Sequence, residues 1–460
     1  MNKRKFIKNS LIMTIIMLIS QVLSALLNVY LSNKLSAEGM GIYHLTLNVF
    51  IFFASFCTTG VMITVTRIVS ELHTLGKFST AKLSAIVCCC VLALAGTAAG
   101  ILLFTLAETI SVKFLGDARC TVSLKVLSIS LPFMAVSSGI RGYFLALRAA
   151  VRSCADQLCE ALVRIAVCYS IVVPFSARGL EYACCAAAVS LTVSEIASFI
   201  ISLVLFIFGT SNTLSDKTLP RKIKHKILSI ILPVTASSVL RSGLGMTENT
   251  LIPLGLQKHS MSVSQSLSTY GIIHGMALPA ISYPYILISS FSSMIIPEMS
   301  EAHAKGNISY IKRVSKKVLI STLTFTLPMT VLFYFSADMV SCLLYGGKSA
   351  GVYIRILSLT IPFIYTDHVV DALLKGLNEQ LHYFLYNIID SITRTILALF
   401  LIPKYGVPAI IVIIFISSIL NSTLSALRLL KVTNLEITFK DVTKPILAVV
   451  CTFLLCCMVF

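Results

Sequence analysis

The sequence G-I-Y-H at Gly41–His44, followed by S-E-L-H-T-L-G-K at Ser70–Lys77, decides the fold because it occurs twice. Moving 230 residues along the chain gives G-I-I-H at Gly271–His274 and S-E-A-H-A-K-G-N at Ser300–Asn307. Eight of the 37 aligned positions are identical, and there is no gap. The offset persists over more than 120 residues and also pairs Gly116 with Gly346, Pro132 with Pro362, and Arg164 with Arg394. We therefore predict a duplicated half.

Composition excludes an ordinary soluble domain. The chain is 57% hydrophobic and 12% charged, with a mean hydropathy of +0.91, whereas soluble domains are about 25% charged. Repeated apolar runs of this length are typical of transmembrane helices. We predict an all-α integral membrane protein with about thirteen spans. They lie near residues 10–32, 42–66, 83–106, 123–147, 156–175, 182–208, 227–252, 268–296, 317–336, 352–374, 382–402, 408–430 and 445–460.

The basic residues lie in short loops between the apolar runs. With the spans placed as above, 24 lysines and arginines fall on the side of the N-terminus and 8 on the opposite side. Such an excess marks the cytoplasmic side, so we expect a multi-pass plasma-membrane protein with a cytoplasmic N-terminus. The net charge of +18 is thereby explained by topology, and no nucleic-acid partner is expected.

The polar segment 209–226 lies where the two copies of the repeat meet. We predict an N-lobe at 1–208, a cytoplasmic linker at 209–226, a C-lobe at 227–430, and an extra helix at 431–460 that is short or incomplete. Two six-span lobes joined on the cytoplasmic side have the same orientation and form a parallel repeat. This architecture is typical of carriers that work by alternating access.

Ionisable residues inside spans cost about 2.5–3.5 kcal/mol on insertion scales and therefore face the interior of a bundle. Arg241 and Glu248 lie two turns apart on one face of span 227–252, with Gly243 and Gly245 between them. They are candidates for a substrate-facing gate, and the alternative is structural pairing with neighbouring helices.

Other ionisable residues recur at matching places. His44 and His274 are equivalent, and they either carry a proton or form hydrogen bonds near the outer interface. Arg141 lies alone in span 123–147. Two acid–base pairs at i, i+4 are predicted to be structural: Glu160 with Arg164, and Asp390 with Arg394.

Asp367 and Asp371 share one face of span 352–374. They can hold a cation or a proton, or they can neutralise Lys375 or His368. We expect no metal site, because most of the 14 cysteines lie in apolar runs without paired C-x-x-C motifs. A nucleotide-binding loop of the G-x-x-x-x-G-K-[ST] type and a catalytic arrangement are also missing. We expect neither a cofactor nor enzymatic activity.

Several segments resemble the family of stage V sporulation protein B and its polysaccharide-biosynthesis relatives: Ser20–Tyr43, Arg67–Glu71, Tyr270–Pro279 and Ile296–Ala302. That family is grouped with lipid II flippases and multidrug and toxin extrusion (MATE) carriers. The resemblance implies a MATE-like flippase for an undecaprenyl-linked saccharide such as lipid II, serving peptidoglycan, spore cortex or polysaccharide synthesis. Its partners would be the lipid-linked oligosaccharide, membrane lipids and cell-wall synthesis enzymes.

The resemblance has one departure at the first span. Lipid II flippases carry S-R-V-L and then R-D there, and those arginines line a cationic cavity. Here the matching residues are Ser20–Leu23 and then Leu27-Asn28. Gln21 and Asn28 become candidate polar contacts to sugar or phosphate, and Arg241 becomes the candidate anion site. Two alternatives remain: a cation-coupled drug exporter that uses Glu248, Asp367 and Asp371, and a non-transporting scaffold for cell-wall enzymes.

Overall fold

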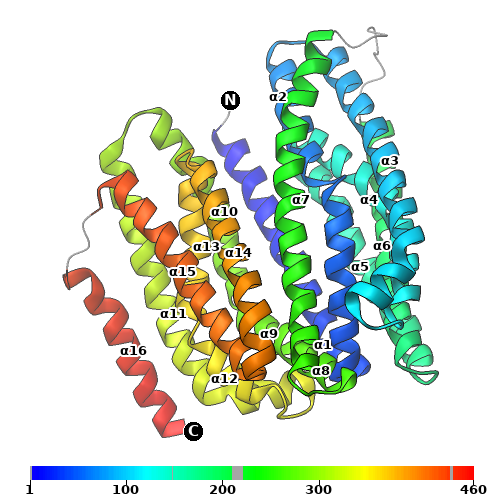
Figure 1. Ribbon diagram of the computed structural model, residues 1–460. Coiled ribbons are helices and arrows are strands. Elements are labelled where there is room, and N and C mark those ends of the chain that lie inside the picture. Colours follow the sequence, from blue (N-terminus) through cyan, green and yellow to red (C-terminus); the bar gives the residue numbers. More distant parts are fainter. Residues whose placement is uncertain (1–2, 148, 210–220, 436–438, 460) are drawn as a thin grey trace. The chain divides into compact units, whose positions relative to one another are not determined.

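The computed structural model describes residues 3–147, 149–209, 221–435 and 439–459, and every element in these ranges is helical (Figure 1). This confirms the predicted all-α class. Most of the predicted linker 209–226 lies outside the described residues. Its last residues, from Arg221 onward, already form the start of a long helix.

Contacts between residues divide the chain into two compact units. Unit 1 consists of Met1–Leu27 and Ile42–Thr250, and unit 2 consists of Asn28–Gly41 and Leu251–Phe460. Two helices contribute to both units, and each unit is described by itself. The lobes predicted from the repeat divide the chain at other residues and stay a prediction.

Unit 1 is a bundle in which α3 packs on α4, α4 on α6, and α5 on α6 (Figure 1). Its buried core includes Val65, Leu92 and Phe144, from three different helices, and Ile227 from α7 joins it. The elements that contribute to this unit are α1 (Lys3–Ser55), α2 (Thr59–Thr74), α3 (Phe78–Thr109), the π-helix η1 (Ile110–Leu115), α4 (Cys120–Ala146), α5 (Ala150–Ser176), α6 (Leu180–Gly209) and α7 (Arg221–Lys258).

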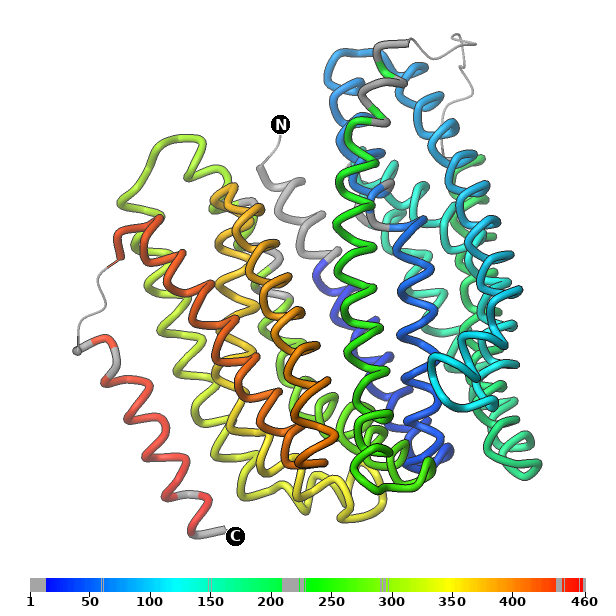
Figure 2. The backbone as a smooth tube through the Cα atoms, in the orientation of Figure 1, coloured from blue at the N-terminus to red at the C-terminus, as the bar shows by residue number. Residues whose placement is uncertain are grey.

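Unit 2 has its own core, centred on Met299, Leu373 and Leu429. The last helix packs against α11, as Figure 2 shows in red beside yellow-green. The elements are α8 (Val263–Tyr270), the π-helix η2 (Gly271–Ala277), α9 (Leu278–Ser282), α10 (Tyr285–Ala304), α11 (Ile308–Tyr345), α12 (Gly351–Ser358), α13 (Ile361–Gly376), α14 (Gln380–Tyr405), α15 (Val407–Thr433) and α16 (Phe439–Val459).

The sequence repeat is visible in the backbone at the ends of matching helices. Gly116 and Gly346 both adopt the left-handed conformation, with φ of 75° and 68°, which glycine accepts without steric cost. Just before each of them a serine hydroxyl closes the turn. Ser111 donates to the carbonyl of Asp117 and Ser341 donates to the carbonyl of Gly347, both at 2.6 Å. The offset between these two turns is again 230 residues.

Two predicted spans, 42–66 and 268–296, are broken at matching places. The first is interrupted between Ser55 and Thr59, and the second between Ser282 and Tyr285. Pro284 explains the second break, because proline donates no backbone hydrogen bond. The first break contains no proline. There the Thr58 hydroxyl bonds back to the Ala54 carbonyl at 2.9 Å, a contact that often bends helices.

The structure differs from the predicted spans in how they are joined. Residues 10–32 and 42–55 form one helix, α1, which is kinked at Ser36 with a φ of 63°. Helices α12 and α13 form a bent pair at 58° next to Pro362, whereas α4 runs unbroken through the matching Pro132. In the described ranges nine helices are long and apolar enough to cross a membrane, or ten if the bent pair is one span. The count of thirteen stays a prediction.

Candidate functional site

Helix α7 carries an exposed cation and a buried carboxylate. Arg241 is exposed, whereas Glu248 is 6% exposed. The structure does not bring the two together, because seven residues of helix separate them by about 10 Å. Gly243 lies against the ring of Phe52, and a Cβ at Gly245 would meet open space. The helix is thus loosely packed between its two charged residues.

Unit 1 contains a buried charge network that the sequence revealed only in part. Arg141 holds Asp156 through its Nε at 2.9 Å and through a second guanidinium nitrogen at 2.8 Å. Glu160 lies 4.0 Å from the same guanidinium, and the Ser202 hydroxyl donates to Asp156 at 3.2 Å. Arg141 is therefore paired, and its main partner is an aspartate that we did not predict. The spacing of Asp156 and Glu160, one turn apart, was the available signal.

The predicted intrahelical pair of Glu160 and Arg164 is replaced by other contacts. Arg164 donates to the hydroxyl of Tyr43 at 2.7 Å, while the guanidinium 4.0 Å from Glu160 is that of Arg141. Neighbouring helices supply better-placed partners than the next turn of α5 does. In the second half, by contrast, Asp390 and Arg394 do form the i, i+4 ion pair, at 3.1 Å.

A third acid, Glu195 of α6, belongs to the same network and was also missed. It is 5% exposed and interacts electrostatically with Glu160, Arg141 and Arg164. A single acid inside an otherwise apolar helix was the signal for it. The network then contains two arginines and three carboxylates. Because buried charge is costly when unbalanced, this arrangement favours the uptake of one proton.

Unit 2 contains a buried carboxylate cluster between α13 and α15. Asp367 accepts a hydrogen bond from the Asn421 amide at 2.7 Å, and the Ser425 hydroxyl donates to Asp371 at 3.4 Å. The other oxygen of Asp367, Oδ1, is buried without a hydrogen-bond partner among the described residues, and so is Oδ1 of Asn421. Lone oxygen atoms in a buried site suit a proton or a hard cation. The cluster therefore combines carboxylate and amide oxygens with unused bonding capacity.

The two residues that could have neutralised these aspartates have aromatic partners. Lys375 places its amine 4.2 Å from the ring centre of Tyr383, and His368 stacks on Tyr285 at 4.6 Å. The described residues contain no group of three or more His, Cys, Asp or Glu that could hold a metal ion. The cluster is thus built for a weakly held, singly charged species rather than for a tightly bound metal.

The broken span of unit 2 exposes backbone carbonyls, and side chains from three helices meet them. Asn28 of α1 donates to the carbonyl of Gly275 at 3.2 Å, Tyr345 of α11 donates to that of Met276 at 2.8 Å, and Tyr365 of α13 donates to that of Ile281 at 2.5 Å. Irregular backbone at membrane depth persists only where its polar groups are satisfied. Asn28 also donates to the Tyr283 hydroxyl at 3.3 Å.

The remaining candidates lie apart from one another. Nε2 of His44 is buried without a hydrogen-bond partner in the described chain. His274 lies in η2 and stacks on Tyr270 at 4.7 Å. The two equivalent histidines therefore have different surroundings. Gln21 is exposed on α1.

Comparison with known proteins agrees with this architecture. A family model described as polysaccharide biosynthesis protein matches residues 6–245. Stage V sporulation protein B of Bacillus subtilis is 24% identical over 460 residues, which cover 96% of this chain and 86% of that protein. Sporulation protein YkvU of the same organism is 19% identical over 358 residues, covering 77% of this chain and 78% of that protein.

Solved structures with the same fold come from two kinds of transporter. An inward-facing multidrug resistance MATE family transporter has a TM-score of 0.71 at 14% identity, covering 91% of this chain and 96% of that one. The lipid II flippase MurJ, in an inward closed conformation, has a TM-score of 0.66 at 16% identity, covering 98% of each chain. These likenesses confirm the MATE-like fold.

Proposed function

The chain belongs to the polysaccharide biosynthesis protein family, and from this premise we propose that it flips a lipid-linked saccharide precursor from the inner to the outer leaflet. It is a multi-pass membrane transporter and not an enzyme. The proposed substrate is undecaprenyl-linked and similar to lipid II. The similarity to a sporulation protein over 96% of the chain supports a role in peptidoglycan or spore cortex synthesis.

The observation that carries the proposal is the exposed Arg241 inside a candidate membrane span, Ser229–Lys258. A guanidinium exposed within an apolar helix is costly unless it meets an anion or water. The diphosphate of a lipid-linked saccharide is such an anion, and arginine binds phosphate oxygens in pairs. Gln21, exposed on α1, would contact sugar hydroxyls. The polyprenyl tail would stay in lipid.

Energy for the transport step has a proposed entry point in unit 2. The unpaired oxygens of Asp367 and Asn421, with Asp371 one turn away, form a binding site for a proton or a monovalent cation. In unit 1 the network around Arg141, Asp156 and Glu195 carries one acid more than its two arginines balance. Binding at either place would change the charge of a buried cluster and so bias one conformation over another.

The test is lipid II binding to the purified protein by native mass spectrometry. We expect the wild type to bind lipid II and Arg241→Ala to lose most of that binding. Arg178→Ala is the matched control, because Arg178 is also exposed but lies in the loop after α5. If Arg241→Ala binds lipid II as well as the wild type does, Arg241 is not the anion site.

The same experiment separates the two alternatives. If the wild type fails to bind lipid II but binds hydrophobic cations, it is a cation-coupled drug exporter, and Glu248 with Asp367 and Asp371 would be its working residues. If it binds neither and cell-wall enzymes co-purify with it, it is a scaffold. The cytoplasmic N-terminus, which the proposed direction requires, is tested by reporter fusions at residue 1 and after Tyr405.

A further inference from the structure

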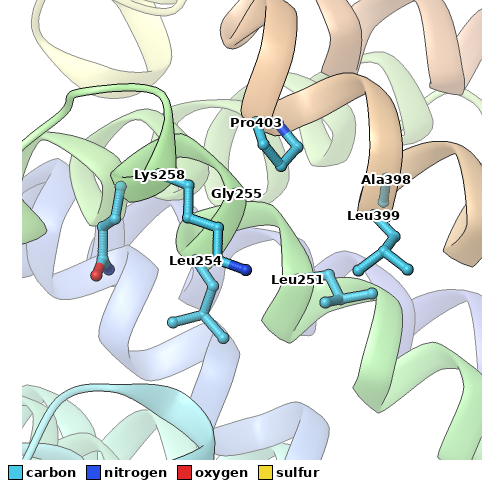
Figure 3. A pocket seen from close by; sticks show the side chains of 8 residues that line it. Leu251, Leu254, Gly255, Lys258, Ala398, Leu399 and Pro403 are labelled. Atoms are coloured by element: carbon cyan, nitrogen blue, oxygen red, sulfur yellow. The ribbon is translucent and has the colours of Figure 1, made fainter.

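A pocket of about 350 Å³ lies in unit 2 between the ends of α7 and α14. Leu251, Leu254 and Lys258 line it from α7, and Ala398, Leu399 and Pro403 line it from α14 (Figure 3). Five of these six side chains are apolar. The volume falls within the range of small-molecule sites.

The pocket exists because small residues face each other while the helices touch beyond them. Gly255 is packed so closely that a Cβ on it would lie 2.8 Å from Ile402. One turn further, His259 lies with its Nδ1 3.2 Å from the carbonyl oxygen of Pro403. These contacts hold the two helix ends together, and Ala398 leaves the space between them unfilled.

The position of the pocket along the helices matches a membrane interface. Lys258 and Tyr405 are the last residues of two candidate membrane spans, Ser229–Lys258 and Gln380–Tyr405. Leu251 is seven residues before Lys258, so the pocket extends about 10 Å inward from the end of the span. A polar group at Lys258 would thus lie among headgroups, and a chain at Leu251 would lie in hydrocarbon.

Lys258 supplies the polar end of the pocket. Its side chain points toward Leu251 and Leu254, with the amine at the mouth of the space between them (Figure 3). Within the described chain the amine has no ion-pair or hydrogen-bond partner. A lysine at a membrane interface attracts anionic lipid.

We propose that this pocket binds one anionic phospholipid of the bilayer, with an acyl chain between α7 and α14 and the phosphate on Lys258. The site is separate from Arg241 and does not depend on the transported substrate. A free phosphate would gain nothing from the apolar walls. A saccharide would leave its hydroxyls without partners there, which is costly. One lysine also matches the single charge of phosphatidylglycerol.

The test is lipid retention by the full-length protein, measured by native mass spectrometry with phosphatidylglycerol, phosphatidylcholine and undecaprenyl phosphate offered separately at equal concentration. We expect the wild type to retain phosphatidylglycerol over the other two. Lys258→Gln should reduce that retention about fivefold, the effect of one lysine near an anionic surface. Lys404→Gln is the matched control, because Lys404 lies at the end of the other span but outside the pocket, and it should leave retention unchanged.

A second variant tests the apolar part. Ala398→Phe fills the pocket and should abolish retention, with circular dichroism and gel filtration confirming that the variant is folded. The proposal is overturned if Lys258→Gln retains as much phosphatidylglycerol as the wild type does. It is also overturned if phosphatidylcholine binds equally well, or if undecaprenyl phosphate binds in preference to both phospholipids.

Discussion

Gly271 lies so close to Ala37 that a Cβ on the glycine would collide with the alanine carbonyl oxygen. The relationship is reciprocal, because a Cβ on Gly41 would collide with the carbonyl oxygen of Leu267. Each pair combines residues 230 positions apart in the repeat. Within unit 2, therefore, each copy of the repeated motif presents its glycine to the backbone of the other. Close crossings at small residues are the usual way for membrane helices to associate.

Gly271→Ala is expected to destabilise the protein by about 1–3 kcal/mol, the usual cost of overpacking. The measurement is thermal unfolding in detergent. Gly245→Ala is the matched control in a helix, because its Cβ would meet open space. That substitution should be neutral or stabilising by up to about 1 kcal/mol. Equal unfolding temperatures for the two variants would show that the crossing is not tightly packed.

Asp156→Asn should destabilise unit 1 by about 3–5 kcal/mol, because Arg141 would lose its closest partner in a buried site. Arg141→Leu in the same chain should recover most of that loss, since no unpaired charge then remains. The measurement is the double-mutant cycle of unfolding free energies. Additive effects would contradict a direct coupling between the two residues.

The fold was predictable from the sequence to a larger extent than the site. Apolar runs and the repeat predicted an all-α duplicated membrane protein, because both patterns report chemistry along the chain. The break after Ser55 was not predicted, since it arises from hydroxyl contacts such as that of Thr58 rather than from proline. Similarly, Arg164 bonds to Tyr43, which is 121 residues away. A partner so distant in sequence is brought close only by tertiary packing.

If Asp367 holds the coupling ion, then proton or cation binding should stabilise the folded protein. We expect the unfolding temperature of the wild type to rise on replacing choline by sodium, or on lowering the pH. Asp367→Asn should remove that dependence. Asp338→Asn is the control, because Asp338 pairs with Arg355 in a half-exposed ion pair at 2.7 Å, and it should keep the response. A wild type insensitive to both sodium and pH would rule out an ion site here.

Asn28 allows a direct choice between a substrate contact and support of the broken span. Its amide donates to the carbonyl of Gly275 and to the hydroxyl of Tyr283. Leucine in its place would leave a buried carbonyl unsatisfied, which costs about 1–3 kcal/mol. Asn28→Leu should therefore lower the unfolding temperature of the substrate-free protein, and Tyr365→Phe should act in the same direction through Ile281.

The matched control is Asn387→Leu. Asn387 is also half-buried, but its amide donates at 2.9 Å to Tyr383, one turn back on its own helix, where the carbonyl already accepts a helical hydrogen bond. Its loss should leave stability nearly unchanged. If Asn28→Leu unfolds like the wild type without substrate but binds lipid II more weakly, Asn28 is a substrate contact. If it unfolds earlier and the remaining folded protein binds lipid II normally, its amide serves to hold η2 open for the break at Pro284.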